Sequence, residues 1–182
     1  MIHHIDVSTV LRRAVCDLYS NLVTRPTGAA VRTEIEQLLA ANPGRMLTII
    51  DFTHVGLLDF SCADEIVAKL LLRFVGEGAE EDYFLFRGVG EHHLEAIETV
   101  LERHGLALVL EDAAGRPCLV GEVSDAQREA WEAVVRLRRA EAGDLARVLG
   151  VAPDEAEARL GALSRRRLVM RLAGAYVPVG IQ

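Results

Sequence analysis

One stretch, from Met46 to Glu65, constrains the fold of this chain more than any other. Its first part, from Met46 to Phe52, is apolar on both alternating faces apart from Thr48 and Asp51. This pattern is typical of a strand that is covered on both sides, because a strand that faces water alternates apolar and polar residues. The stretch therefore predicts a central strand of a layered sheet.

A helix is predicted directly after that strand. Ser61 stands three residues before Asp64 and is interpreted as the helix cap that opens an apolar run at helical spacing. The spacing leaves Glu65, Lys69 and Arg73 for the face expected to be solvated. In open α/β sheets, the loop beyond the carboxyl end of a strand is where ligands and partners most often bind. Residues 53–61 are therefore the candidate functional edge.

Strands and helices alternate over the first two thirds of the chain. Further strands are predicted over residues 2–7, 18–23, 83–87, 106–110 and 118–121, and further helices over 8–17, 29–41 and 91–103. An acidic, glycine-containing loop is expected over residues 76–82. This order predicts an α/β fold in which a mixed sheet is layered by helices.

The residues that open the predicted helix also carry a family resemblance. The run Asp59-Phe60-Ser61-Cys62-Ala63-Asp64-Glu65-Ile66 resembles the signature region of STAS-type domains, the sulphate-transporter and anti-sigma-factor-antagonist modules. It is more similar to the bacterial STAS-like group of unknown function. The resemblance implies a STAS-like fold and a protein partner such as a kinase-like or sigma-related regulator, with partner contacts at Asp59, Phe60, Ser61, Asp64 and Glu65. In the antagonists a phosphorylated serine follows the loop aspartate; that position is Phe60 here, so the resemblance assigns no phosphorylation to Ser61.

The pattern changes at Val123. Ser124 and Gln127 form a capping-box pair ahead of a helix to about residue 139, and two further helices are predicted over 143–149 and 153–166. Two short strands follow, over 168–172 and 176–179. Three helices and a hairpin in this order resemble the winged helix-turn-helix of bacterial regulators. The chain is therefore predicted to divide into a STAS-like unit, residues 1–122, and a winged helix-turn-helix unit, residues 123–182.

Charge is divided unevenly between these two units. Residues 1–122 carry ten basic and nineteen acidic side chains and residues 123–182 carry ten and eight, so the net charge of −7 divides into −9 and +2. Such asymmetry suggests two modules with different partners, and the acidic one is not expected to bind nucleic acid itself.

DNA is the partner that the second resemblance implies. Arg159 is the candidate for reading base edges, and the candidates for phosphate contact are Arg165, Arg166, Arg167 and Arg171. The exposed positions at the start of the predicted recognition helix are acidic, namely Asp154, Glu155 and Glu157, and phosphates repel them. The fold therefore favours DNA binding while the predicted surface weakens it.

The sequence contains no motif typical of an enzyme, a metal site or a membrane span. The three cysteines, Cys16, Cys62 and Cys118, are scattered without zinc or redox spacing, which indicates a reduced, cytoplasmic protein. We expect no enzyme activity, no cofactor, no metal site and no membrane span. Two hypotheses remain: a transcriptional regulator that couples STAS-like sensing to DNA binding, and a protein-interaction adaptor whose winged helix serves docking or homodimer formation.

Overall fold

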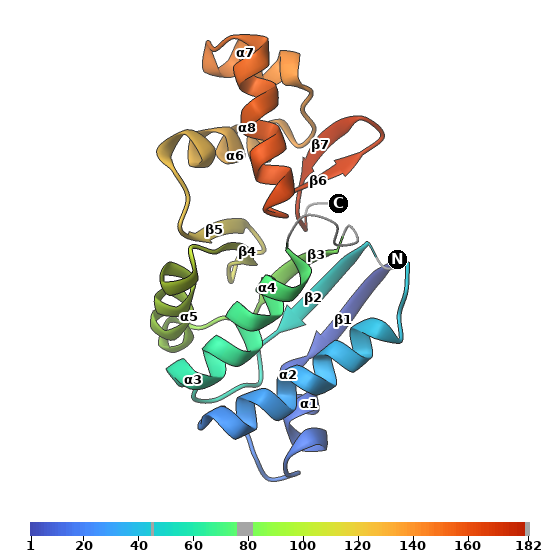
Figure 1. Cartoon of the computed structure of the whole chain (residues 1–182), viewed down its shortest axis with the longest axis vertical. Coiled ribbons are helices and arrows are strands. Elements are labelled where there is room, and N and C mark those ends of the chain that lie inside the picture. The colour runs from blue at the N-terminus through green and yellow to red at the C-terminus, as the bar shows by residue number, and fades with distance from the viewer. Residues whose placement is uncertain (45, 76–81, 181–182) are drawn as a thin grey trace.

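The computed structural model describes residues 1–44, 46–75 and 82–180, and it confirms the α/β class. Five strands form one mixed sheet in the order β1-β2-β3-β4-β5, in which β1 to β4 run parallel and β5 runs antiparallel to β4. The strands are β1 (Ile2–Asp6), β2 (Leu47–Asp51), β3 (Tyr83–Arg87), β4 (Ala107–Glu111) and β5 (Pro117–Gly121). Figure 1 shows a smaller unit of helices and a hairpin joined to this sheet after β5.

Helices cover one face of the sheet. They are α1 (Val7–Ala14), α2 (Arg25–Ala40), α3 (Phe60–Ala63), the π-helix η1 (Asp64–Lys69), α4 (Leu70–Phe74) and α5 (Glu91–His104). Alternate strand residues, among them Ile50, Phe84, Phe86 and Leu108, point into this layer and form one buried cluster with the helices. The alternation follows from the two-residue period of a strand.

The other face of the sheet packs against the C-terminal unit. That unit consists of α6 (Asp125–Leu137), α7 (Ala142–Leu149), α8 (Pro153–Arg165), β6 (Val169–Leu172) and β7 (Ala175–Pro178). The strand residues of opposite parity, including Leu47, Tyr83, Leu85 and Val109, belong to one continuous buried cluster with its helices and hairpin. Gly180 closes this contact, because a Cβ added there would lie 2.7 Å from the Leu85 Cδ2. The boundary between residues 122 and 123 stays a prediction.

Several local signals in the C-terminal unit are confirmed. Ser124 caps α6 in a capping box with Gln127, and Pro153 occupies the first turn of α8. Trp131 is buried in the core, where its Nε1 donates a hydrogen bond to the Leu168 carbonyl at 3.1 Å. A buried indole N–H needs such an acceptor, so this bond fixes α6 against the start of the hairpin.

One predicted strand and one predicted helix boundary in the first unit are wrong. Residues 18–23 do not form a strand, because their only ladder contact is a single parallel bridge between Leu22 and Leu58. Helix α2 begins at Arg25, four residues before the predicted start, because Pro26 is accommodated in the first turn, where its missing N–H has no helical partner to lose. The acidic loop expected over residues 76–82 lies outside the described residues except for Asp82.

Candidate functional site

The candidate edge begins where β2 ends, at Asp51. The Asp51 Oδ1 accepts a hydrogen bond from the Thr53 N–H at 2.8 Å, and Oδ2 lies 2.9 Å from the His4 Nε2. Burial acts to raise the pKa of Asp51, but the hydrogen bonds from Thr53 and His4 outweigh it and lower the pKa. Asp51 is therefore an ionised carboxylate that fixes the first turn of the following loop.

Asp59, rather than the predicted Ser61, is the cap of the helix. The Asp59 Oδ1 accepts hydrogen bonds from the Cys62 N–H and the Ser61 hydroxyl, both at 2.8 Å. Its Oδ2 accepts from the Thr24 N–H, also at 2.8 Å. The Asp59 carboxylate is the cap because its two oxygens can accept all three hydrogen bonds, whereas the Ser61 hydroxyl donates its own hydrogen to that carboxylate. Asp59 therefore joins the start of α3 to the start of α2.

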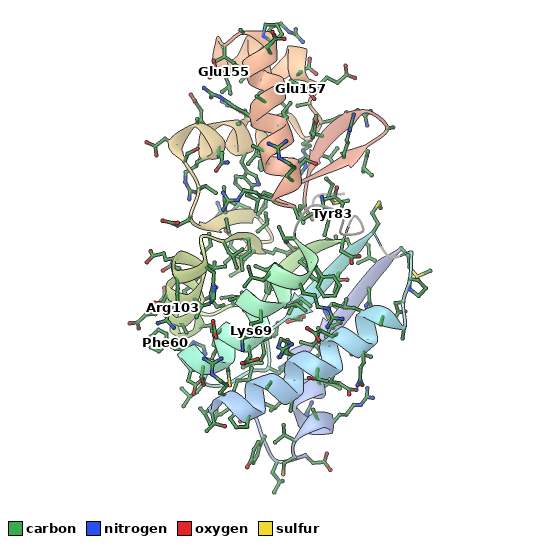
Figure 2. All side chains as sticks on the ribbon, viewed as in Figure 1. Phe60, Lys69, Tyr83, Arg103, Glu155 and Glu157 are labelled. Carbon is green, nitrogen blue, oxygen red and sulfur yellow. The ribbon has the colours of Figure 1, made fainter. Side chains whose placement is uncertain are left out.

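Apolar side chains surround this joint and face water. Leu57, on the loop before α3, is 60% exposed. Phe60, at the first position of α3, is 49% exposed (Figure 2). Across the joint, three exposed side chains belong to the connection between α1 and α2, namely Leu18, Tyr19 and Val23. We name the surface formed by Leu18, Tyr19, Val23, Leu57 and Phe60 the apolar edge. Large exposed apolar residues on two adjoining segments are a candidate interaction surface.

Backbone hydrogen bonds hold the two halves of the apolar edge together. The Leu22 N–H donates to the Leu57 carbonyl at 2.7 Å, and the Asp59 N–H donates to the Leu22 carbonyl at 2.9 Å. The side chain of Asn21 adds a bond from the Leu57 N–H at 2.8 Å. This surface is therefore preorganised, which lowers the entropic cost of binding a partner.

Sequence reasoning missed the half of this edge that lies between α1 and α2. A periodic pattern predicts which face of an element is buried, but it does not predict which two loops meet. The available signal was Leu18 and Tyr19, two large apolar residues directly followed by the polar Ser20 and Asn21, in a segment that was predicted to be a strand. Such a segment is a candidate for an exposed apolar contact surface.

Asp64 and Glu65 are buried, which corrects the prediction that Glu65 lies on the solvated face. Glu65 is only 2% exposed. Its carboxylate accepts hydrogen bonds from Arg25 at 2.7 Å, from Arg32 at 3.0 Å and from Lys69. The same Arg25 Nη1 lies 2.8 Å from the Asp64 Oδ2. Burial opposes ionisation, but the bonds from Lys69, Arg25 and Arg32 outweigh it and lower the pKa of Glu65.

The physical reason for this correction is the π-helix η1. In a π-helix each backbone bond spans five residues, so its wider turn rotates side chains away from the positions that a period of 3.6 predicts. Helix α2 then packs over η1 and brings its guanidinium groups to the two carboxylates. Asp64 also bonds the His104 Nε2 at 2.8 Å at the end of α5. The buried carboxylates of Asp64 and Glu65 therefore join η1 to α2 and α5, and their predicted role in partner contact stays a prediction.

His93 ties α5 to the loop of the candidate edge. Its Nδ1 accepts from the Gly90 N–H at 3.1 Å, and its Nε2 lies 2.7 Å from the Gly56 carbonyl, to which it donates. Burial lowers the pKa of His93 and outweighs the favourable bond to Gly56. The imidazole is therefore neutral and holds the loop that carries Leu57.

Arg159, the predicted base-reading residue, is paired with two carboxylates. Its side chain is 17% exposed and lies between two glutamates: one Nη is 3.1 Å from Glu129 and the other bonds Glu155. Glu129 belongs to α6 and Glu155 to the preceding turn of α8. These two carboxylates compensate the charge of the Arg159 guanidinium. Glu155 and Glu157 lie toward the end of α8 that points away from the sheet (Figure 2).

Two of the predicted phosphate-contacting arginines lie at the junction of the two units. Arg166 donates to the Glu122 carbonyl at 2.6 Å, to the Gly105 carbonyl at 3.3 Å and to Gln127 at 3.0 Å. The Arg167 guanidinium lies 5.8 Å from the centre of the Tyr83 ring. These contacts direct both side chains toward the first unit and away from an outer surface.

Arg165 and Arg171, the other two predicted phosphate-contacting arginines, are exposed. The Arg171 guanidinium lies 6.0 Å from the centre of the Tyr176 ring. Burial and Glu157 raise the pKa of the Tyr176 hydroxyl, while the charges of Arg171 and Arg165 act in the opposite direction. Arg139 joins them, since its Nη2 lies 3.5 Å from the Ala173 carbonyl in the hairpin turn, and Arg138 precedes it. We name Arg138, Arg139, Arg165 and Arg171 the hairpin arginines. Among the described residues, none of the four pairs with a carboxylate.

Comparisons with protein-family models, with curated proteins and with solved structures each found no match. Within residues 1–44, 46–75 and 82–180, no helix has the length and apolar character to cross a membrane. The same ranges contain no group of three or more His, Cys, Asp or Glu side chains arranged to hold a metal ion.

Proposed function

We propose that this chain is a non-enzymatic bacterial regulatory protein that binds a protein partner at the apolar edge of a STAS-like unit. One observation carries the proposal: five exposed apolar side chains gather on two loops that Asp59 and the backbone hold together. A soluble protein that keeps such a rigid apolar surface uses it for association. The position of this surface, beyond the carboxyl ends of parallel strands, is also where partners most often bind.

The C-terminal unit supports the second half of the proposal, a winged helix-turn-helix over residues 123–182. Its order of three helices followed by a two-stranded antiparallel hairpin is the order of that fold. Helix α5 contacts both regions: His93 near its start bonds the loop of the apolar edge, and Gly105, which caps its end, accepts a bond from Arg166. A partner at the edge therefore acts on an element that also contacts the C-terminal unit.

The test is loss of a partner when the apolar edge is made acidic. Leu57→Asp combined with Phe60→Asp should reduce the recovery of a specific partner at least tenfold when the full chain is used as bait in a lysate of the native host. Leu72→Asp is the matched control, because Leu72 is an exposed leucine on α4. The proposal fails if no protein distinguishes the double variant from the wild type while both remain folded.

Contact with DNA is a second candidate function, and the hairpin arginines favour it. The exposed guanidinium groups of Arg139 and Arg171 lie at the hairpin, with Arg138 and Arg165 also exposed. Such groups suit phosphate contacts, which need cations but no sequence reading. The acidic end of α8 and the neutralised Arg159 disfavour base contacts by the helix itself. The expected mode is therefore weak binding that depends little on sequence.

Salt dependence tests this second candidate. Each lost phosphate contact flattens the slope of log affinity against log salt by about 0.9 on duplex DNA, so Arg139→Ala with Arg171→Ala should flatten it by up to about 1.8. Arg159→Ala should leave the slope unchanged, because that guanidinium is already paired. If a random-sequence duplex is not retarded even at low salt, the C-terminal unit serves docking or homodimer formation instead.

A further inference from the structure

The connection between α1 and α2 runs as a short extended segment beside the β2–α3 loop. The Gly56 N–H donates to the Ser20 carbonyl at 2.7 Å, the Leu22 N–H donates to the Leu57 carbonyl at 2.7 Å, and the Asp59 N–H donates to the Leu22 carbonyl at 2.9 Å. The last two bonds form the single parallel bridge of Leu22 with Leu58, and the first bond extends this short ladder to Ser20. Only every second residue of the segment takes part in them.

The residues between those rungs leave one side of the segment open. In an extended segment, successive residues direct their main-chain groups to opposite sides. The main-chain groups of Asn21 and Val23 are therefore directed away from the β2–α3 loop, while the side chain of Asn21 bonds the Leu57 N–H. Among the residues that the structure describes, their main-chain N–H and C=O groups find no protein partner, and both residues are exposed. The segment therefore has the property of a sheet edge, which accepts another strand.

A pocket of about 270 Å³ lies beside this segment. It is lined by Leu18, Tyr19, Ser20, Asn21, Val23, Thr24 and Thr27. Its lining residues come from the segment and the first turn of α2 and not from the β2–α3 loop, so the pocket lies on the open side of the ladder. It is smaller than the roughly 300–1,000 Å³ of sites for drug-sized ligands, and it suits a single large side chain. Leu18, which is 91% exposed, forms part of its wall.

We propose that the partner presents an extended peptide that adds as a strand to Asn21 and Val23 and inserts one large apolar side chain into this pocket. The inference rests on the proposed function, since it names the kind of partner segment that the apolar edge takes. Strand addition draws affinity from main-chain hydrogen bonds and specificity from pockets for alternate side chains. A helical partner cannot use the open groups, because a helix satisfies its own backbone.

The test removes one open donor without changing the ladder. Val23→Pro deletes an N–H that points away from Leu57, and the extended conformation of Leu22 is the one that a following proline favours. Val23→Thr is the matched control, because it keeps the N–H and the branched shape. The probe is a fluorescent synthetic peptide, Lys-Thr-Val-Thr-Phe-Thr-Val-Thr-Lys, and binding to the full chain is followed by anisotropy.

Wild type and Val23→Thr should bind the peptide within about twofold of each other, and Val23→Pro should bind at least fivefold more weakly, which corresponds to one lost hydrogen bond of about 1 kcal/mol. The amides of Asn21 and Val23 in the wild type should also exchange more slowly with solvent when the peptide is bound. The second measurement does not depend on the folding of the variant.

Two results overturn strand addition: no binding of the peptide to the wild type, or equal binding to Val23→Pro with unprotected amides at both positions. The cellular partner separates this inference from the proposed function. If Leu57→Asp with Phe60→Asp loses the partner while Val23→Pro retains it, the apolar edge binds by its side chains alone and strand addition is wrong. If neither variant loses a partner, the proposed function itself fails.

Discussion

Replacing Glu65 by glutamine should destabilise the first unit far more than an exposed glutamate would. The substitution keeps the shape of the side chain but removes the charge that Arg25, Arg32 and Lys69 share, and it points an amide N–H₂ at donors. Removing one partner of a buried ion pair costs roughly 3–5 kcal/mol. Here the cations are partly exposed, and Arg25 and Arg32 keep other carboxylates, so we expect about 2 kcal/mol.

Urea unfolding followed by far-UV circular dichroism measures this change. With a slope of about 2 kcal/mol per molar urea, the midpoint should fall by about 1 M. Glu95→Gln is the control, because Glu95 is exposed on α5, and it should change the free energy of unfolding by no more than about 0.5 kcal/mol. Equal midpoints for the two variants would refute the reasoning, because they would show that Glu65 behaves as the solvated charge that a helical period of 3.6 predicts.

Three further predictions concern other parts of the fold. The pKa of His93 is lower in the folded protein than in the unfolded chain, so the unfolded chain binds more protons below about pH 6.5. The free energy of unfolding should therefore fall as the pH drops through that value. His93→Gln should weaken this pH dependence, as measured by urea titrations at several pH values. Trp131→Phe should cost about 1–3 kcal/mol by thermal unfolding, since it leaves the buried Leu168 carbonyl without its donor; a change below 0.5 kcal/mol would contradict the role of that bond. Gly88→Ala should lower the free energy of unfolding by more than about 2 kcal/mol, because the new Cβ would lie 2.4 Å from the Thr53 nitrogen. Gly174→Ala, at a similar positive φ but with open space around it, should lower it by about 1 kcal/mol. Equal decreases in the two variants would show that the backbone conformation alone matters.

Many of the helices and strands can be predicted from short stretches of the sequence. The covered strand of residues 47–51, the capping box of Ser124 and Gln127 and the proline that opens α8 were all predictable. Each depends on neighbours within about four residues, so the physical cause and the pattern lie in the same short window. The same holds for the hairpin of β4 and β5, whose turn contains Gly115 before Pro117.

The candidate site depended on contacts between distant segments. Glu65 is buried against Arg25, which is 40 positions away in sequence, and it lies in a π-helix that a helical period of 3.6 does not predict. Arg159 is paired with Glu129 of α6, which lies 30 positions earlier in the sequence. The helical pattern predicted that Arg159 is exposed, but it could not predict this ion pair. Asp59 took the capping role from Ser61 because Thr24, 35 positions away, also needed an acceptor.

The sequence by itself determined which elements form and which of their faces are apolar, because periodicity and capping act over a single turn or strand. The tertiary structure decided which charges are satisfied and which surfaces stay open, because ion pairs and loop pairings form only where the packed elements bring distant groups together. The apolar edge and the hairpin arginines are products of that second step.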